Sequence, residues 1–194
     1  MTALTLYFGP GASSMAVHIA LHEVDAPFEA KPVSFANNET RTAEFLSLNP
    51  AGKVPTLLVD GTPLTEVAAC LLYLAKRFPQ SGLMPADPLG EAQAVSWMSF
   101  IASTLHPARR QGLEHVTEVW TLAERKFGDG AWALGTYSVA DIHLFRLYWR
   151  MVNAPRPYPQ GLRRLDGLYE RMMARPAVRR TIEIESRVGY ELPA

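Results

Sequence analysis

The sequence predicts an α/β domain followed by an all-α domain, and three observations support this. Short apolar runs alternate with helical patterns in the N-terminal part of the chain. Prolines and glycines then cluster over residues 79–90, as in a linker. Beyond that point we find helical periodicity and no convincing strand pattern. We therefore expect domains at 1–79 and 91–194, joined by a linker at 80–90.

The N-terminal domain is predicted to run in the order β-α-β-α-β-β-α. Gly9-Pro10-Gly11 breaks the first strand, Asp60-Gly61 is a hairpin turn, and Pro79 ends the last helix. The expected elements are a strand at Leu4–Phe8, a helix from Ser13 or Ser14 to about Val24, a strand at Phe28–Val33, a short helix at Thr42–Leu48, hairpin strands at Thr56–Val59 and Thr62–Leu64, and a helix to Phe78.

The second domain is predicted to contain only helices. One segment, Ser138–Val152, is apolar almost all round, which is typical of a central, buried helix. The other expected helices are one carrying Val95, Met98, Ile101 and Leu105, one at Leu113–Lys126, one from Leu162 to Met172, and one that starts near Val178.

Composition and charge exclude several classes of protein. The 194 residues are 48% hydrophobic, with 19 basic and 19 acidic side chains, so we expect no nucleic-acid partner. A single cysteine, Cys70, rules out an intramolecular disulfide and a cysteine-based zinc site. No apolar run approaches the ~20 residues that span a bilayer, and the N-terminus lacks a secretory pattern. We expect a soluble cytoplasmic protein with no membrane partner.

Residues 49–67 form the most informative segment of the chain. An apolar residue precedes Pro55, an apolar run follows, the Asp60-Gly61 turn reverses the chain, and Thr65-Glu66 opens a helix. Two interpretations of the proline are open. It could follow a cis bond in a tight turn, or it could be an ordinary proline at the start of a strand.

The stretch from Leu6 to Leu21, LYFGPGASSMAVHIAL, resembles the start of beta-class bacterial glutathione transferases. Ser13 stands at the position of that class's cysteine, and Ser14 keeps its serine. The resemblance continues through Asn49–Glu66, Trp97–His106, Tyr137–Asp141 and Arg175–Val178. It implies a thioredoxin-like N-terminal domain, an all-α C-terminal domain, glutathione as co-substrate and a homodimer.

The resemblance also implies which residues of the N-terminal domain bind glutathione. The Val54–Pro55 bond is expected to be cis, with the Val54 backbone pairing with the cysteinyl part of the tripeptide. Glu66 and Val67 are expected at its γ-glutamyl end, although relatives usually carry serine or glycine where Val67 stands. Lys53 is a further expected contact.

Three more expected site residues follow from the same resemblance. Phe35 and Ser99 are expected to contact glutathione, and His106 to reach the sulfur from the helical domain. Two positions of the helical domain also depart from the class, which often has asparagine where Ser99 stands and lysine where Pro107 stands. The segment between His106 and Ser138 is also shorter than in a typical member, so the resemblance says little about the second substrate.

A serine hydroxyl is chemically sufficient to activate glutathione. Lowering a thiol pKa from ~8.5 by about two units takes roughly 2.7 kcal/mol. One hydrogen bond to a charged group contributes about 1.5–3 kcal/mol, and a helix N-terminus contributes about 0.3–1 kcal/mol. Ser13 and Ser14 both lie where the first helix begins, so one could bind the sulfur while the other caps the helix. We favour Ser13 for the sulfur and keep both as candidates.

Ser138-Val-Ala-Asp141 has the pattern of a capping box, with Tyr137 and Ile142 as a hydrophobic staple. Asp141 is therefore interpreted as a folding residue rather than a catalytic one. Cys70 is interpreted as an inert core residue.

The predicted function is conjugation of the glutathione thiolate to a small, apolar electrophile. Two alternatives remain. One is a glutathione-dependent reductase or lyase, although a mixed-disulfide mechanism needs a cysteine where Ser13 stands. The other is a protein that binds glutathione without catalysis.

Overall fold

The computed structural model describes residues 3–155 and 157–191, and the chain divides into two compact units. The first joins the residues up to Phe78 with the segment from Pro176 onward, and the second runs from Pro79 to Arg175. This division differs from the expected 91–194 domain at its C-terminal end. The last helix groups with the first unit because it packs along the first helix of the chain.

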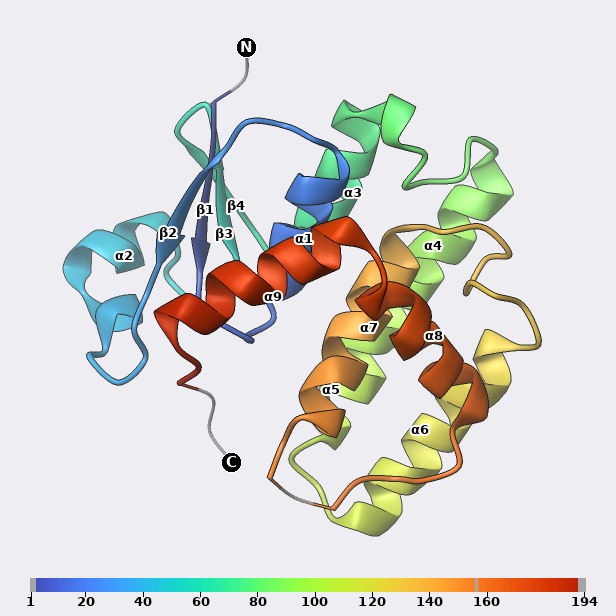
Figure 1. Cartoon of the computed structure of the whole chain (residues 1–194). Helices are drawn as coiled ribbons and strands as arrows, with labels where there is room; N and C mark the ends of the chain where they lie inside the picture. Colours follow the sequence, from blue (N-terminus) through green and yellow to red (C-terminus); the bar gives the residue numbers. More distant parts are fainter. Residues whose placement is uncertain (1–2, 156, 192–194) are drawn as a thin grey trace. The chain divides into compact units, whose positions relative to one another are not determined.

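The first unit has the predicted order of elements, with one helix added from the C-terminus (Figure 1). The elements are β1 (Leu4–Phe8), α1 (Met15–Glu23), β2 (Glu29–Pro32), α2 (Ala43–Leu48), β3 (Thr56–Val59), β4 (Thr62–Thr65), α3 (Val67–Arg77) and α9 (Pro176–Val188). The thioredoxin-like prediction for this part of the chain is confirmed by the mixed four-stranded sheet and its flanking helices.

The strands follow the order β2-β1-β3-β4, with β1 parallel to β2 and the other two pairs antiparallel. Phe8 pairs with Pro32, Tyr7 pairs with Thr56, and Thr56 pairs with Thr65. The ends of β1, β2 and β4 and the start of β3 therefore share one edge of the sheet. The loops that leave this edge carry most of the predicted glutathione-binding residues.

The sheet of the first unit has helices on both faces. Leu4, Leu6 and Phe8 of β1 are buried on the face that α1 covers, where the Phe8 ring lies 4.9 Å from that of His18. Tyr7 points to the other face and meets Phe45 of α2 edge-on at 5.8 Å. Alternation along β1 thus separates the two sides of the sheet.

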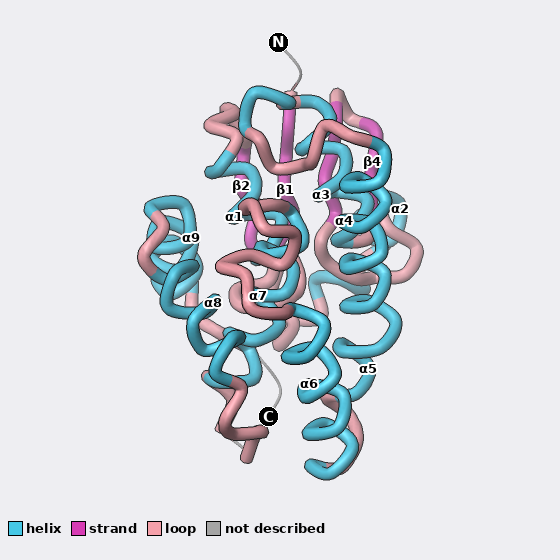
Figure 2. The backbone as a smooth tube through the Cα atoms, turned by 90° about the vertical axis from the view of Figure 1, so that its right-hand side faces the viewer, coloured by secondary structure: helices cyan, strands magenta, loops and turns pink. Residues whose placement is uncertain are grey.

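The second unit contains only helices among its described residues (Figure 2). They are the short turn Pro79–Ser81, α4 (Pro88–Phe100), a π-helical turn (Ile101–Leu105), α5 (His106–Ala108), α6 (Leu113–Phe127), α7 (Val139–Val152) and α8 (Arg163–Met173). As predicted, α7 is central, and its residues from Val139 to Met151 are all buried.

Two sequence expectations for this unit need correction. The linker was expected to reach residue 90, but α4 begins at Pro88, because the Asp87 carboxylate caps it by accepting the Gly90 N–H at 2.8 Å and proline fits the first helical position. The apolar spacing that predicted this helix included Val95, which is 45% exposed. The buried positions of this segment are Gly90, Ala94, Trp97, Met98, Ile101 and Leu105, with the π-turn widening the spacing at its end.

The capping box is present in full. The Ser138 N–H donates to the Asp141 carboxylate at 2.9 Å, and the Ala140 N–H donates to the Ser138 hydroxyl at 3.3 Å. The Ala133 N–H also donates to Asp141, at 2.8 Å. Burial nevertheless raises the pKa of Asp141 to about 6. These contacts explain the acid as part of the fold.

Across the part of the chain that the structure describes, no helix is both long enough and apolar enough to cross a membrane.

Candidate functional site

Ser13 lies in the turn that leads from β1 into α1, and the residue is partly exposed. Its Oγ donates a hydrogen bond to the Val54 carbonyl at 2.8 Å. This contact joins the first loop of the chain to the residue before Pro55, 41 positions away. The two segments that the sequence singled out are thus adjacent in the fold.

Ser14 has a different environment from Ser13. Its side chain is fully buried, and its Oγ bonds to the Gly9 backbone, accepting from the N–H and donating to the C=O, both at 3.2 Å. The sequence makes its hydroxyl a candidate cap for the helix, but Ser14 makes no side-chain cap hydrogen bond. Ser14 therefore stabilises the turn that precedes α1.

The Val54–Pro55 bond is cis, as expected from the resemblance. A buried side chain, Asn49, holds the preceding loop. Its Nδ2 donates to the Lys53 carbonyl at 2.7 Å and to Thr56 Oγ1 at 3.2 Å, and its Oδ1 accepts the Ala51 N–H at 3.1 Å. One amide thus fixes both sides of the Val54–Pro55 segment.

Glu66 precedes α3 and is exposed, while Val67 is the first helical residue. Because Thr56 pairs with Thr65, Glu66 follows β4 at the sheet edge where Pro55 precedes β3. The Glu66 backbone has φ +69°, a region that residues other than glycine rarely adopt. Such a conformation costs of order 1–3 kcal/mol and is found mainly at functional positions.

Phe35, in the loop after β2, lies at the same edge of the sheet. Its ring lies so close to Gly9 that a Cβ on Gly9 would meet a ring carbon at 2.4 Å. Phe35 also packs against the cluster formed by Val33, Phe45 and Val54. Nearby, the Glu191 carboxylate accepts bonds from the Ser34 hydroxyl and the Ala36 N–H, and these bonds lower the pKa of Glu191.

A buried contact between Glu185 and His18 supports the loop that carries Ser13. Glu185 of α9 is fully buried, and its Oε2 accepts the Gly11 N–H at 2.6 Å. Its Oε1 lies 2.9 Å from Nδ1 of His18, which is also fully buried on α1. The contact joins three segments of the first unit, so Glu185 fixes the loop two residues before Ser13.

Asn49 and Glu185 were not predicted as site residues, although the sequence contains a signal for each. Asn49-Pro50 is a turn dipeptide at the start of the most informative segment. Glu185 falls on the buried side of α9 with Val178 and Thr181, where an acid needs a partner. The partner, His18, is 167 residues away and could not be identified from local spacing.

The structure brings together Ser13, Val54 and Pro55 by contact, and the sheet register places Phe35 and Glu66 at the same edge. Lys53 is exposed in the loop before Val54. Ser99 is exposed on α4, and His106 follows the π-turn, both in the second unit. Their roles at the sulfur and in glutathione binding stay predictions.

Comparison with known proteins assigns the chain to a family. The glutathione S-transferase N-terminal domain matches residues 2–76. Glutathione S-transferase GstA of Escherichia coli is 30% identical, over 94% of this chain and 98% of the relative. The chain therefore belongs to the glutathione S-transferase family.

Solved structures agree with this assignment. A beta-class transferase of Sphingomonas chungbukensis is 33% identical and covers 93% of this chain and 98% of its own, with a TM-score of 0.83. A sphingomonad transferase solved in complex with glutathione is 32% identical, covers 94% of this chain and 98% of its own, and has a TM-score of 0.84.

A relative with a different named activity also matches by sequence. A maleylacetoacetate isomerase of Pseudomonas aeruginosa is 28% identical over 68% of this chain and 73% of that relative.

Proposed function

We propose that this protein is a glutathione transferase that joins the glutathione thiolate to a small, apolar electrophile. The observation that carries the proposal is the contact between the Ser13 hydroxyl and the Val54 carbonyl at the sheet edge. In the proposed reaction the bound thiol loses its proton to water, and the thiolate forms a C–S bond to the electrophilic carbon. A leaving group departs with its electron pair, or an adjacent atom is protonated.

Val54 provides a backbone site for a peptide-like ligand in this proposal. Its N–H and C=O can pair with the cysteinyl residue of glutathione as an added strand would. The Ser13 hydroxyl now donates to the Val54 carbonyl at 2.8 Å. When a ligand N–H takes over that carbonyl, the Ser13 hydroxyl becomes available to donate to the sulfur. Glutathione binding and thiolate stabilisation would thus be coupled through one oxygen atom.

Two observations favour Ser13 over Ser14 as the residue that activates the thiol. Ser13 is partly exposed, whereas Ser14 is fully buried with its hydroxyl engaged on Gly9. Ser13 also precedes α1, whose N-terminus favours a nearby anion. The summed contributions, about 1.5–3 and 0.3–1 kcal/mol, reach the roughly 2.7 kcal/mol that a two-unit pKa shift requires.

Glu66 and Val67 are proposed to bind the γ-glutamyl end. The Glu66 carboxylate can accept from the ligand's amino group, and the Val67 N–H at the start of α3 can donate to its carboxylate. The positive φ of Glu66 supports a functional role, since a strained backbone persists only where the surrounding structure holds it.

A mixed-disulfide reductase is disfavoured on this site. Its mechanism needs a reactive cysteine at the first helix, and the single cysteine of the chain is Cys70, buried in α3. Burial raises the pKa of the Cys70 thiol to about 12, which keeps it protonated and unreactive.

The experiment that tests the proposal compares the wild type with Ser13→Ala and Ser14→Ala. Glutathione affinity is measured by calorimetry, the pKa of the bound thiol by thiolate absorbance, and conjugation with an activated aryl halide. We expect Ser13→Ala to raise the thiol pKa and lower kcat/KM by about 10–1000-fold, with a smaller effect for Ser14→Ala. The opposite order would reverse the assignment, and two silent variants would disprove the mechanism. Binding without conjugation in the wild type would support the non-catalytic alternative.

We also propose that the protein forms a homodimer. Leu89 and Val95 of α4 are 69% and 45% exposed, and isologous pairing is the commonest form of association. Light scattering tests this. A mass near twice 21.5 kDa is expected, and a mass near 21.5 kDa at every concentration would refute it.

A further inference from the structure

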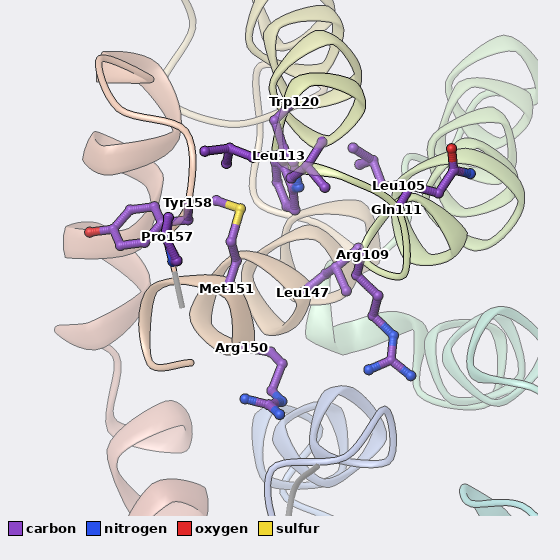
Figure 3. Close-up of a pocket in the computed structure, with 11 residues that line it drawn as sticks. Leu105, Arg109, Gln111, Leu113, Trp120, Leu147, Arg150, Met151, Pro157 and Tyr158 are labelled. Atoms are coloured by element: carbon purple, nitrogen blue, oxygen red, sulfur yellow. The ribbon is translucent and has the colours of Figure 1, made fainter. Parts of the chain in front are cut away.

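The helical unit contains a cavity of about 200 Å³ that none of the proposed glutathione-binding residues lines (Figure 3). Its walls come from the π-helical turn, α6, α7 and the loop that follows α7. The apolar side chains on these walls include Leu105, Leu113, Val116, Trp120, Leu147 and Met151. Walls of aliphatic and aromatic side chains favour an apolar ligand.

The charged and polar ends of the other lining residues do not face this apolar space. In Figure 3 the guanidinium groups of Arg109 and Arg150 extend away from the ring of Trp120, and the Tyr158 hydroxyl also points away from that ring. Both arginines already interact with other groups of the chain. An ionised ligand would lose its hydration here without gaining a counter-charge, so the cavity favours neutral molecules.

One buried donor gives the cavity a polar feature. Trp120 is 2% exposed, and its ring meets that of Tyr148 at 5.4 Å in a T-shaped contact. No described residue accepts a hydrogen bond from the Trp120 indole N–H. The nitrogen is not fully enclosed by protein atoms, so the opening that reaches it is the cavity that the ring lines. A buried donor without an acceptor is unfavourable, and a ligand that supplies an acceptor there is favoured.

The size of the cavity limits the ligand that it can hold. A dry cavity of about 150 Å³ holds one benzene ring, so about 200 Å³ accommodates one ring with a short substituent. We propose that this cavity binds a small, neutral aromatic molecule that carries one hydrogen-bond acceptor. The ring lies against Leu147 and Met151, and the acceptor receives the Trp120 indole N–H.

Three probes of similar size test the polarity of the site. Acetophenone and ethylbenzene are neutral and differ in one carbonyl oxygen, while benzoate carries a charge. Calorimetric titration of the full-length protein without glutathione should show saturable, one-to-one binding of acetophenone and at least about tenfold weaker binding of benzoate, because its charge would be buried without a partner. Absence of acetophenone binding up to its solubility limit, or equal affinity for benzoate, would overturn the proposal.

Matched variants test the location of the site. Val116→Trp on α6 should fill the cavity and abolish binding of acetophenone, whereas Leu122→Trp on the same helix, at a position 47% exposed and outside the lining, should not change it. Leu113→Trp is a second filling variant, at a position that is itself 49% exposed and can accept a larger side chain. Unchanged acetophenone affinity in a folded filling variant would refute this location.

The role of the indole N–H is tested by Trp120→Phe, which keeps an aromatic ring and removes the donor. This variant should weaken acetophenone about fivefold relative to ethylbenzene, as expected for one lost hydrogen bond. Trp97→Phe, which changes a buried tryptophan of α4 outside the lining, should leave the ratio of the two affinities unchanged. Parallel losses for both probes in Trp120→Phe would mean that the ring acts through packing, and would contradict the assigned hydrogen bond.

This binding is separable from the proposed conjugation. All the described residues that line the cavity belong to the second unit, whereas Ser13 belongs to the first. Acetophenone affinity should therefore be the same in Ser13→Ala as in the wild type. A loss of acetophenone binding in Ser13→Ala would contradict a site formed by the helical unit.

Discussion

The buried contact of Glu185 with His18 and Gly11 makes a quantitative prediction about the stability of the first unit. Glu185→Ala removes a fully buried carboxylate and leaves the Gly11 N–H and the His18 imidazole without this acceptor. Breaking a buried pair by removing one partner costs about 3–5 kcal/mol. For a chain of this size, each kcal/mol corresponds to about 2–4 °C, so Tm should fall by roughly 6–20 °C.

The matched variant is Glu185→Gln, which keeps the shape and the hydrogen-bonding atoms. Its carbonyl oxygen can accept from Gly11 and its amide can donate to an unprotonated His18 nitrogen. We expect a loss of about 1–2 kcal/mol, the difference between charged and neutral hydrogen bonds. Urea unfolding of both variants measures these values, and the slope of the transition should be unchanged.

Two further measurements test the role of the Glu185 carboxylate. Hydrogen exchange at the Gly11 amide should accelerate in Glu185→Ala and much less in Glu185→Gln, because the bond to that amide is the feature removed. A double-mutant cycle with His18→Phe should show a coupling well above 0.5 kcal/mol. If Glu185→Ala loses less than about 1 kcal/mol of unfolding free energy, the buried contacts of Glu185 do not stabilise the unit.

Three other predictions follow from the structure. The folded pKa of Asp141, about 6, exceeds the unfolded value of 3.8, so its stabilising contribution is complete below pH ~4 and is lost as pH rises through about 6. Relative to Asp141→Asn, the free energy of unfolding of the wild type should fall by up to about 3 kcal/mol between those limits. If urea melts show a difference between the two proteins that does not change with pH, this prediction is wrong. Asn49→Ala should cost about 1–3 kcal/mol and weaken glutathione binding, whereas the exposed Asn37→Ala should do neither; equal effects in calorimetry and urea melts would refute a positioning role for Asn49. Cys70 should react with a disulfide reagent only after unfolding, because the thiol is buried and its pKa is raised to about 12, and rapid labelling of the native protein would show otherwise.

Local signals in the sequence determined the elements of this protein and much of its family assignment. The Asp60-Gly61 turn has both residues at positive φ, as a two-residue hairpin requires, and β3 and β4 begin where the pattern placed them. The 138–141 motif forms a complete capping box for the same reason, since both partners lie within one turn. Interactions between residues close in sequence can be inferred from spacing alone.

The features of this protein that depend on contacts between distant residues were decided only by the tertiary structure. Ser13 and Ser14 are neighbours with the same hydroxyl, and only folding made one partly exposed beside Val54 and the other buried on Gly9. The last helix, assigned by periodicity to the helical domain, belongs to the first unit because Glu185 is buried against His18. A buried charge needs a partner, but the sequence does not state which distant residue supplies it.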